Sequence, residues 1–564
     1  MMSYVVRLLC SVLFLWSTVS LFLPQHMYAN ENSHLEDSTK EFDFDFDMVA
    51  FDDDDDYQFM EYLDTAGMDH ISRAINPVDI MIILNRLGIP TILEEPIFLH
   101  TNVLNKRSLL DQPIFEPDRA EFPKSFVVGA HAFAHKIDRS NFTKHSTKLA
   151  SYIALTEETL LTKLQNAINE INELFPLGVN IDFADLFSVF ENMTVEERQV
   201  GFMFHCMKRW RKTTFRLLLP IYYLQSNFSL TPQEKELAEE VLNPIFGVFD
   251  PEEADIFNKQ HFISDKIGFG DTRIEVDNIT MKRPRYTLRC GGFVTLPTAW
   301  TWGAGFAGSQ FPKPSSLPMF EIDPLIEAGN SSTAEATAIL KDFLLDSLDR
   351  VAADLLDTPL GNNHHFGAGA YMRWKLPLRH FIGTTFADRM HFAGRTSLEV
   401  QLPSSEKRFY INKINEQAFA DRNFNDTENA EVAADNVQFL KEQVVERLFL
   451  RAFDTRIIPG VIFRWSGGLY YKGQQWGFNV GPDFWLQSKP HFSKIYAPDA
   501  TLCVIDIPKA KQSIAYQGKA FGGIVLKHPS DRKTWFFSLN GDISLFERGL
   551  GKDYTLSLNF EASF

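Results

Sequence analysis

The feature that most constrains the fold of this chain is the alternating stretch YTLSLNFEASF, residues Tyr554–Phe564. Its apolar residues share one parity and its polar residues share the other, which predicts a strand with one apolar and one polar face. A tilted strand of this length crosses the hydrocarbon core of a bilayer. The alternative is the edge strand of a soluble sandwich, but a solvated edge usually carries charge or proline. We therefore expect a strand that faces lipid.

The same alternation recurs in about a dozen segments between residues 125 and 564. Short polar turns and long insertions follow the strands in alternation, as in outer-membrane barrels. Three insertions have helical periodicity, at residues 156–175, 332–356 and 430–453. The sequence therefore predicts an all-β, antiparallel transmembrane barrel of about 12 strands, with 14 as the alternative, and helical insertions in its long loops. A soluble all-β domain with helical insertions is the competing interpretation.

The N-terminal region combines an export signal with an acidic segment. One basic residue, Arg7, precedes an apolar run that ends near Ala29, which is typical of a cleaved signal peptide, with an uncleaved anchor as the alternative. Residues 31–64 contain 14 acidic residues and a single basic one, Lys40, so we expect this segment to be disordered. The predicted organisation is a signal peptide at 1–29, an acidic disordered segment at 30–66, an N-terminal periplasmic or plug segment at 67–124 and the transmembrane β-barrel at 125–564.

The closing strand resembles the C-terminal assembly signal of Gram-negative outer-membrane β-barrel proteins. In that family the barrel assembly machinery reads an alternating last strand that ends on an aromatic residue. The residues that match this signal are Tyr554, Leu558, Phe560 and Phe564. Ala562 is small where a larger residue is common. The resemblance implies a bacterial outer-membrane location, contact with membrane lipid, and the assembly machinery as a partner.

A second resemblance links two short motifs to outer-membrane transporters of the fatty-acid and aromatic-hydrocarbon type. These transporters carry GD and LPTG stretches. The matching residues here are Gly270, Asp271, Leu296, Pro297 and Thr298, whereas Ala299 stands where glycine is usual.

Strand parity also predicts which charged residues point into the barrel. A charge on the lipid face near the bilayer midplane costs about 2–4 kcal/mol for Lys or Arg, so we assign the charged parity to the lumen. The predicted pore-lining residues are Arg216, Arg273, Arg289, Arg373, Arg395, Arg464, Asp271, Glu275, Glu399 and Asp483. Lys375, Lys519, Asp542 and Glu561 have the same parity. Arginines opposite carboxylates create a transverse field in several pores, and salt bridges that pack a closed lumen are the alternative.

Other classes of function find little support in the sequence. The net charge is −18, and nucleic-acid binding needs a basic surface. Walker, HExxH and GxSxG motifs are absent, so we predict no enzyme activity. The mature cysteines, Cys206, Cys290 and Cys503, lack ligand or disulfide spacing. Strand histidines such as His131 and His205 have no partner that the sequence identifies, so we interpret them as packing residues. No cofactor or metal is predicted.

The sequence as a whole predicts an outer-membrane porin or passive transporter for small solutes. Its selectivity would follow from the width of the lumen and from the excess of arginines. The alternative function is a surface-exposed structural or adhesive barrel with a closed lumen, in which the long loops near 136–198, 224–265, 299–365 and 403–455 bind a partner. A membrane-embedded hydrolase is a third possibility.

Overall fold

The computed structural model describes most of the chain beyond residue 76. The described residues are 77–86, 106–115, 126–138, 194–229, 261–304, 356–380, 387–410, 416–426, 429–448, 451–508, 510–529 and 533–564, with some single residues between these ranges. The chain divides into two compact units. The smaller unit contains residues 1–74 and Leu378–Asp388, and its described part includes the 3₁₀ helix η4 (Leu378–His380).

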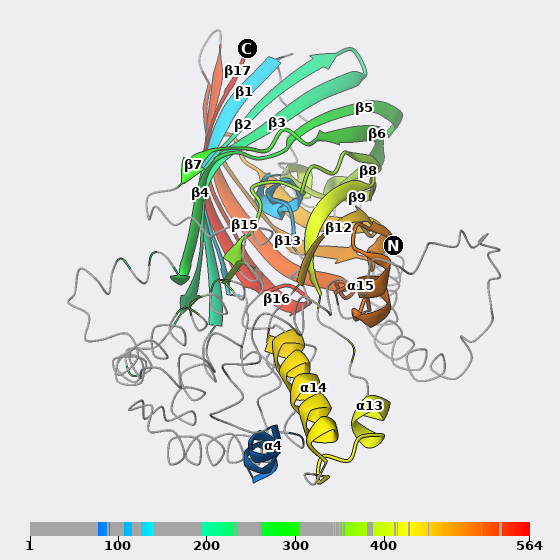
Figure 1. Cartoon of the computed structure of the whole chain (residues 1–564). Coiled ribbons are helices and arrows are strands. Elements are labelled where there is room, and N and C mark those ends of the chain that lie inside the picture. The colour runs from blue at the N-terminus through cyan, green and yellow to red at the C-terminus, as the bar shows by residue number, and fades with distance from the viewer. Residues whose placement is uncertain are drawn as a thin grey trace, which may run out of the picture. The chain divides into compact units, whose positions relative to one another are not determined.

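The larger unit contains a closed antiparallel β-barrel (Figure 1). Its sheet has 14 strands, of which all but β4 and β7 form the ring. The strands of the ring are β1 (Phe126–Asp138), β2 (Thr194–Trp210), β3 (Thr213–Ser229), β5 (Thr272–Arg283), β6 (Tyr286–Leu296), β8 (Gly367–Pro377), β9 (Met390–Gln401), β12 (Ile462–Lys472), β13 (Trp476–Gln487), β15 (Ala515–Pro529), β16 (Thr534–Arg548) and β17 (Lys552–Ser563). The predicted 12-stranded barrel is confirmed.

The ring closes where the last strand pairs with the first. Strand β17 pairs antiparallel with β1, from Val127 opposite Ser563 to Asp138 opposite Lys552. Strand β1 pairs on its other side with β2. A seam of three strands, β17, β1 and β2, therefore joins the two ends of the barrel sequence.

The two ends of the barrel differ in their connections. Short turns at 211–212, 284–285 and 473–475 lie at one end, called the turn end, together with Phe126, Phe564 and the paired strand ends Pro529 and Thr534. Most long insertions leave from the opposite end, called the loop end. Since outer-membrane barrels have short turns on the periplasmic side, we expect the turn end to be the periplasmic one.

Apolar side chains cover the outside of the ring. Leu558 is 63% exposed, and exposed apolar residues recur on most wall strands, among them Val200, Phe202, Leu398, Ile524 and Leu539. An apolar surface that continues around a closed barrel is stable in lipid and not in water. The closed ring also satisfies the backbone groups of every wall strand. The structure therefore confirms an outer-membrane type of β-barrel. Among the described residues, no helix is both long and apolar enough to cross a bilayer.

Two neighbouring wall strands are interrupted and then continue. Strand β4 (Ile263–Phe269) pairs with β3 just beyond the pairing of β3 with β5, so β4 and β5 form one line broken at Gly270 and Asp271. Strand β7 (Trp300–Ala304) follows β6 after a similar break and pairs with β4. These breaks carry the GD and LPTA motifs that the sequence singled out.

A second sheet and several helices lie in the long connections of the loop end. The sheet contains β10 (Ser404–Tyr410), β11 (Arg451–Ile458) and β14 (His491–Ile495). The helices there are α13 (Glu416–Ala420), α14 (Ala430–Leu448) and α15 (Asp499–Val504). The predicted helix at 430–453 is confirmed to Leu448 but was drawn too long, because Arg451–Phe453 pair with β10. The predicted helix at 156–175 and most of that at 332–356 lie outside the described residues.

Helix α4 (Pro77–Arg86) precedes the barrel in sequence and packs against α14. Met81 is fully buried in an apolar cluster with Phe419, Val437 and Leu440. The Asn85 side chain also donates a hydrogen bond to the backbone carbonyl of Phe424. The contact places α4 beside the insertion between β10 and β11.

Candidate functional site

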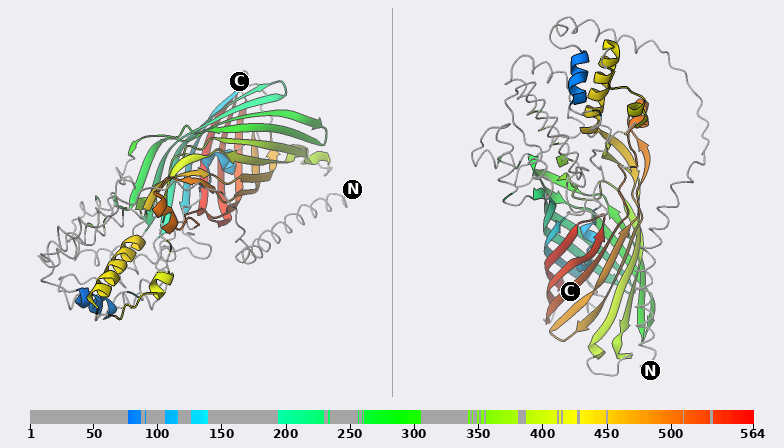
Figure 2. Two further views of the ribbon diagram at one scale, coloured as in Figure 1. Left: turned by 45° about the vertical axis from the view of Figure 1, so that its right-hand side comes forward. Right: turned by 90° about the horizontal axis from the view of Figure 1, so that it is seen from below.

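A short segment that precedes the barrel strands occupies the lumen. Residues Lys106–Phe115, called the lumen segment, form two 3₁₀ turns, η1 (Leu109–Asp111) and η2 (Pro113–Phe115). Figures 1 and 2 show these turns in blue inside the ring. Ser108 caps η1, because its hydroxyl accepts a hydrogen bond of 3.2 Å from the Leu110 amide. Proline at the start of η2 needs no backbone partner for a missing N–H.

One side of the lumen segment is apolar. Its buried side chains are Leu109, Leu110, Ile114 and Phe115. They form a cluster with wall residues of β1, β2 and β3: Phe133, Met203, Leu218, Tyr222 and Leu224. The Phe115 ring packs edge-on against that of Phe133, with ring centroids 5.3 Å apart. Apolar contact on one wall thus fixes the segment laterally.

The other side of the lumen segment is held by charge. Arg107 forms a buried ion pair with Asp483 of β13, and Asp111 accepts a hydrogen bond of 2.8 Å from Arg273 of β5. Gln112 accepts one of 2.6 Å from Lys519 of β15. Buried charges are costly unless they are paired, so these contacts favour one position of the segment in the lumen.

A separate group of arginines lines the neighbouring wall. Four residues, called the arginine wall, come from β3, β6, β8 and β9: Arg216, Arg289, Arg373 and Arg395. Three of them donate to the buried carboxylate of Glu275, with N–O distances of 2.9 Å from Arg216, 3.2 Å from Arg373 and 3.0 Å from Arg395. Arg289 donates to Asp277 at 2.7 Å.

Aromatic and neutral groups complete this cluster. The Arg395 guanidinium lies 4.1 Å from the centroid of the Tyr371 ring, and that of Arg373 lies 5.0 Å from it. Such cation–π contacts stabilise guanidinium groups that have lost water. The Tyr371 hydroxyl in turn donates to Asp277 at 3.0 Å. The wall therefore sets four guanidinium groups against two carboxylates, Glu275 and Asp277.

Two members of the arginine wall are partly exposed. The side chain of Arg216 is 11% exposed and that of Arg373 is 18% exposed, whereas Glu275 is 1% exposed. The guanidinium groups of Arg216 and Arg373 are therefore more accessible than the Glu275 carboxylate that they contact.

The ten predicted pore-lining residues all belong to the barrel interior or to its strand breaks, but they divide into three environments. Arg216, Glu275, Arg289, Arg373 and Arg395 belong to the arginine cluster. The residues Arg273, Glu399, Arg464 and Asp483 lie under or beside the lumen segment. Whether either group lines a path for solutes stays a prediction. The assembly-signal residues Tyr554, Leu558, Phe560 and Phe564 all point outward, with exposed fractions of 41–63%.

Asp271 has a different environment from the other nine. Its carboxylate accepts hydrogen bonds from the backbone amides of Asn362, at 2.7 Å, and Ala299, at 3.3 Å. The Thr298 hydroxyl donates to the Gly270 carbonyl at 3.2 Å. The GD and LPTA motifs therefore meet, and Asp271 holds the two strand breaks together with the chain before β8.

A cavity of about 120 Å³ lies at the loop end, where the lumen segment begins. Its lining includes Lys106, Ser108, Asn363, Gln401, Arg408 and Gln487. Lys106 donates to the Pro359 carbonyl at 2.7 Å. The lining is mixed, because Ile457 and Ile462 also belong to it, and the cavity is large enough for water or a small solute.

Sequence reasoning missed two features of the lumen. It placed residues 67–124 in a periplasmic or plug segment without identifying the ten residues that fill the lumen. It also assigned Glu561 inward by parity but did not connect it with His131 and His205, because the register across the barrel seam is not visible in one sequence. The sequence signal that could have identified this cluster was the row of inward-facing residues on the first and last strands.

The sequence and the structure were compared with known proteins. No protein-family model and no curated protein match the sequence. An outer membrane channel from Pseudomonas putida F1 is 8% identical, covering 80% of this chain and 99% of that chain, with a TM-score of 0.37. The Pseudomonas putida toluene transporter TodX is 9% identical, and the match covers 83% of this chain and 96% of that chain, with a TM-score of 0.28. The Ralstonia pickettii toluene transporter TbuX is 7% identical, and the match covers 78% of this chain and 90% of that chain, with a TM-score of 0.27. Scores of this size do not assign the chain to any of their families.

Proposed function

We propose that this protein is a passive channel of the bacterial outer membrane for small solutes, with a preference for anions. The observation that carries the proposal is the arginine wall, which places four guanidinium groups against two carboxylates inside the barrel. A ring of like charges attracts counter-ions and raises their local concentration. The low dielectric of the surrounding wall strengthens this field.

The lumen segment gives this channel its narrowest part. Arg273 links the lumen segment to the barrel wall, because it donates to Asp111 of the segment at 2.8 Å and to Glu399 of β9 at 2.9 Å. Solutes would pass between the lumen segment and the arginine wall. Such a path selects by size at the segment and by charge at Arg216 and Arg373.

Swelling of liposomes that contain the purified barrel tests this proposal. Two sugar derivatives of equal size, one anionic and one cationic, are compared as permeants. We expect the anion to enter faster, and the ratio of rates to fall towards one when Arg216 and Arg373 are both replaced by glutamine. The control is Arg422→Gln, since Arg422 pairs with Asp435 outside the barrel. Equal entry of both solutes through the unaltered protein would contradict an anion preference.

A second candidate function is a surface-exposed structural or adhesive barrel with a closed lumen. The contact between α4 and α14 favours it, because α14 belongs to an insertion at the loop end. The chain would then run from the outer face through the lumen segment to the turn end, where β1 begins. In this arrangement the barrel holds α4 on the outer surface.

An epitope inserted between Ile75 and Asn76 tests this second function. Antibody labelling of intact cells is expected if α4 lies outside, and labelling only after lysis contradicts it. Liposomes that do not swell, together with surface labelling, would replace the channel proposal with the closed barrel. Swelling with or without labelling would keep the channel.

A further inference from the structure

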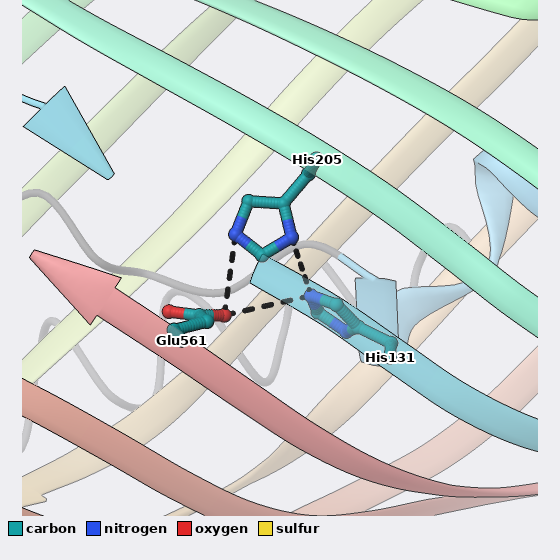
Figure 3. A group of neighbouring side chains, drawn as sticks. All are labelled: His131, His205 and Glu561. Atoms are coloured by element: carbon teal, nitrogen blue, oxygen red, sulfur yellow. Dashed lines mark hydrogen bonds and ion pairs between the residues drawn. The ribbon is translucent and has the colours of Figure 1, made fainter. Parts of the chain in front are cut away.

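Three buried side chains meet on the lumen wall at the barrel seam (Figure 3). His131 comes from β1, His205 from β2 and Glu561 from β17, and their exposed fractions are 2%, 8% and 0%. The Glu561 Oε1 atom lies 3.5 Å from His131 Nε2 and 3.4 Å from His205 Nε2. The two imidazoles are also joined by a hydrogen bond of 2.9 Å between His131 Nε2 and His205 Nδ1.

A glycine makes room for this cluster. Gly129 of β1 lies directly opposite Glu561 on one side and His205 on the other. A Cβ atom at Gly129 would lie 2.4 Å from Glu561 Cγ and 2.4 Å from His205 Cε1. The two side chains therefore lean over the glycine towards each other, and His131, two residues further along β1, completes the group. Any larger residue at position 129 would push the cluster apart.

We propose that His131, His205 and Glu561 bind a divalent transition-metal ion, with zinc as the best-fitting member of that class. One ligand atom from each residue lies within 4.8 Å of the other two. Two donors bound to zinc at about 2.0–2.1 Å in tetrahedral geometry are roughly 3.3 Å apart. The separations of 3.5 Å and 3.4 Å from Glu561 Oε1 are close to this value. A water molecule would fill the fourth position, and the ion would take the place of the hydrogen bond between His131 Nε2 and His205 Nδ1.

The donor set suits zinc in chemistry as well as in geometry. Imidazole nitrogen and carboxylate oxygen are both ordinary zinc ligands. The Phe115 ring of the lumen segment packs on His131, with ring centroids 5.8 Å apart, and covers the cluster from the lumen.

A metal ion at this place would cross-link three strands of the ring. Its ligands belong to the first, second and last strands of the ring, so one ion would link residues that are far apart in sequence. Since the three residues come together only in the closed barrel, the ion binds the folded state in preference to the unfolded one and stabilises it. The proposal therefore assigns the metal a structural role in closing the barrel.

The test uses the full-length barrel in detergent, stripped with EDTA, dialysed and then given Zn²⁺ alone. Bound zinc is counted by mass spectrometry, and stability is followed by the midpoint of the heat-induced shift in gel mobility. We expect one zinc per chain and a midpoint raised by about 5 °C or more. His205→Gln and Glu561→Gln should each lose both effects.

The matched control is His135→Gln. His135 lies on β1, as His131 does, and the two histidines are equally buried. His135, however, forms hydrogen bonds with Asp553 at 3.0 Å and with Gln199 at 3.3 Å. This variant should keep the zinc response. If a variant fails to fold, the proposal is still tested by the zinc content and the midpoint of the unaltered protein with and without Zn²⁺. An unaltered barrel that binds no zinc, or whose midpoint is unmoved by zinc and EDTA, overturns the proposal, as does a His205→Gln variant that responds normally.

Discussion

At the scale of single residues, Glu275 holds the arginine wall together. Three guanidinium groups donate to its carboxylate, which is 1% exposed. Replacement by glutamine would leave three guanidinium groups with a neutral partner, one of them, Arg395, buried. Removing one member of a buried ionic group costs about 3–5 kcal/mol, and we expect E275Q to lower the free energy of unfolding by that amount, measured in urea with refolding into detergent.

The control for E275Q is Asp435→Asn. Asp435 pairs with Arg422 at 2.6 Å on an exposed surface, where an ion pair contributes less than about 1 kcal/mol. If the two variants changed stability equally, Glu275 would not be the centre of a buried network.

Gly129 is a second residue whose substitution has a defined result. In Gly129→Ala the new methyl group would meet the Glu561 and His205 side chains at 2.4 Å. Overpacking of this kind costs about 1–3 kcal/mol, and we expect the zinc response to disappear with it. In the matched variant Gly541→Ala the nearest atom to the new Cβ is 3.4 Å away, so both stability and zinc response should persist. Calorimetry or the gel-shift midpoint measures both.

Residue parity was predictable from the sequence, but residue partners were not. Alternation within a strand is local, and it correctly placed Arg395 and Glu275 on the inner face. The pairing of these two residues spans 120 positions of the chain. It depends on the register of β5, β8 and β9 around the ring, which no single strand specifies.

At the scale of elements, displacement of the lumen segment should have the clearest effect on conductance through the barrel. The double variant Arg107→Gln and Asp111→Asn would remove its ion pairs with Asp483 and Arg273. We expect higher single-channel conductance and more frequent transitions, because the segment then leaves its position more often. Lys494→Gln, in β14 outside the ring, is the control. Unchanged conductance in a folded double variant would indicate that the segment does not narrow the path.

We expect the sheet at the loop end to respond to pH through Glu406. Burial disfavours its ionised form, but Arg408 and His365 outweigh burial and lower the pKa of the Glu406 carboxyl below its ordinary value of 4.5. Arg408 lies 2.8 Å from this carboxylate and Asn363 donates to it at 3.0 Å. Because the pKa is lower in the folded state, the stabilisation is complete above pH 4.5 and is lost as the pH falls through the lowered pKa.

Hydrogen exchange in residues 404–410 measures this effect. We expect exchange to rise as the pH falls below 4.5, after correction for the intrinsic rate. The variant Glu406→Gln should show fast exchange that is independent of pH, and Glu431→Gln, on helix α14, should behave as the unaltered protein. A Glu406→Gln variant with normal exchange at pH 7 would contradict the role of this carboxylate.

The two kinds of element were not equally predictable. Strands such as β16 and β17 alternate over their whole length and were found directly, as was most of α14 from its helical period. The lumen segment has neither period, because its two turns are short and the side chains of both turns are buried. Its residues, KRSLLDQPIF, are equally suited to a loop or to a small core.

At the scale of the whole molecule, the barrel follows from summing local signals. Strand number and the alternation of short turns with long insertions both depend on patterns of a few residues, so they were predictable. What fills the barrel depends on contacts between distant segments, as in the packing of Phe115 against Phe133. The same limit hid the cluster at the seam, where residues 131, 205 and 561 meet.

The most direct measurement is a single-channel recording of the unaltered protein in a planar bilayer under a potassium chloride gradient. We expect discrete current steps and a reversal potential shifted towards the equilibrium potential of chloride. The reason is that the four guanidinium groups of the arginine wall outnumber the two carboxylates that face them. Heat-modifiable mobility of the same sample shows that the barrel is folded. A silent bilayer with a folded barrel, or a reversal potential on the side of potassium, would contradict an anion-preferring channel.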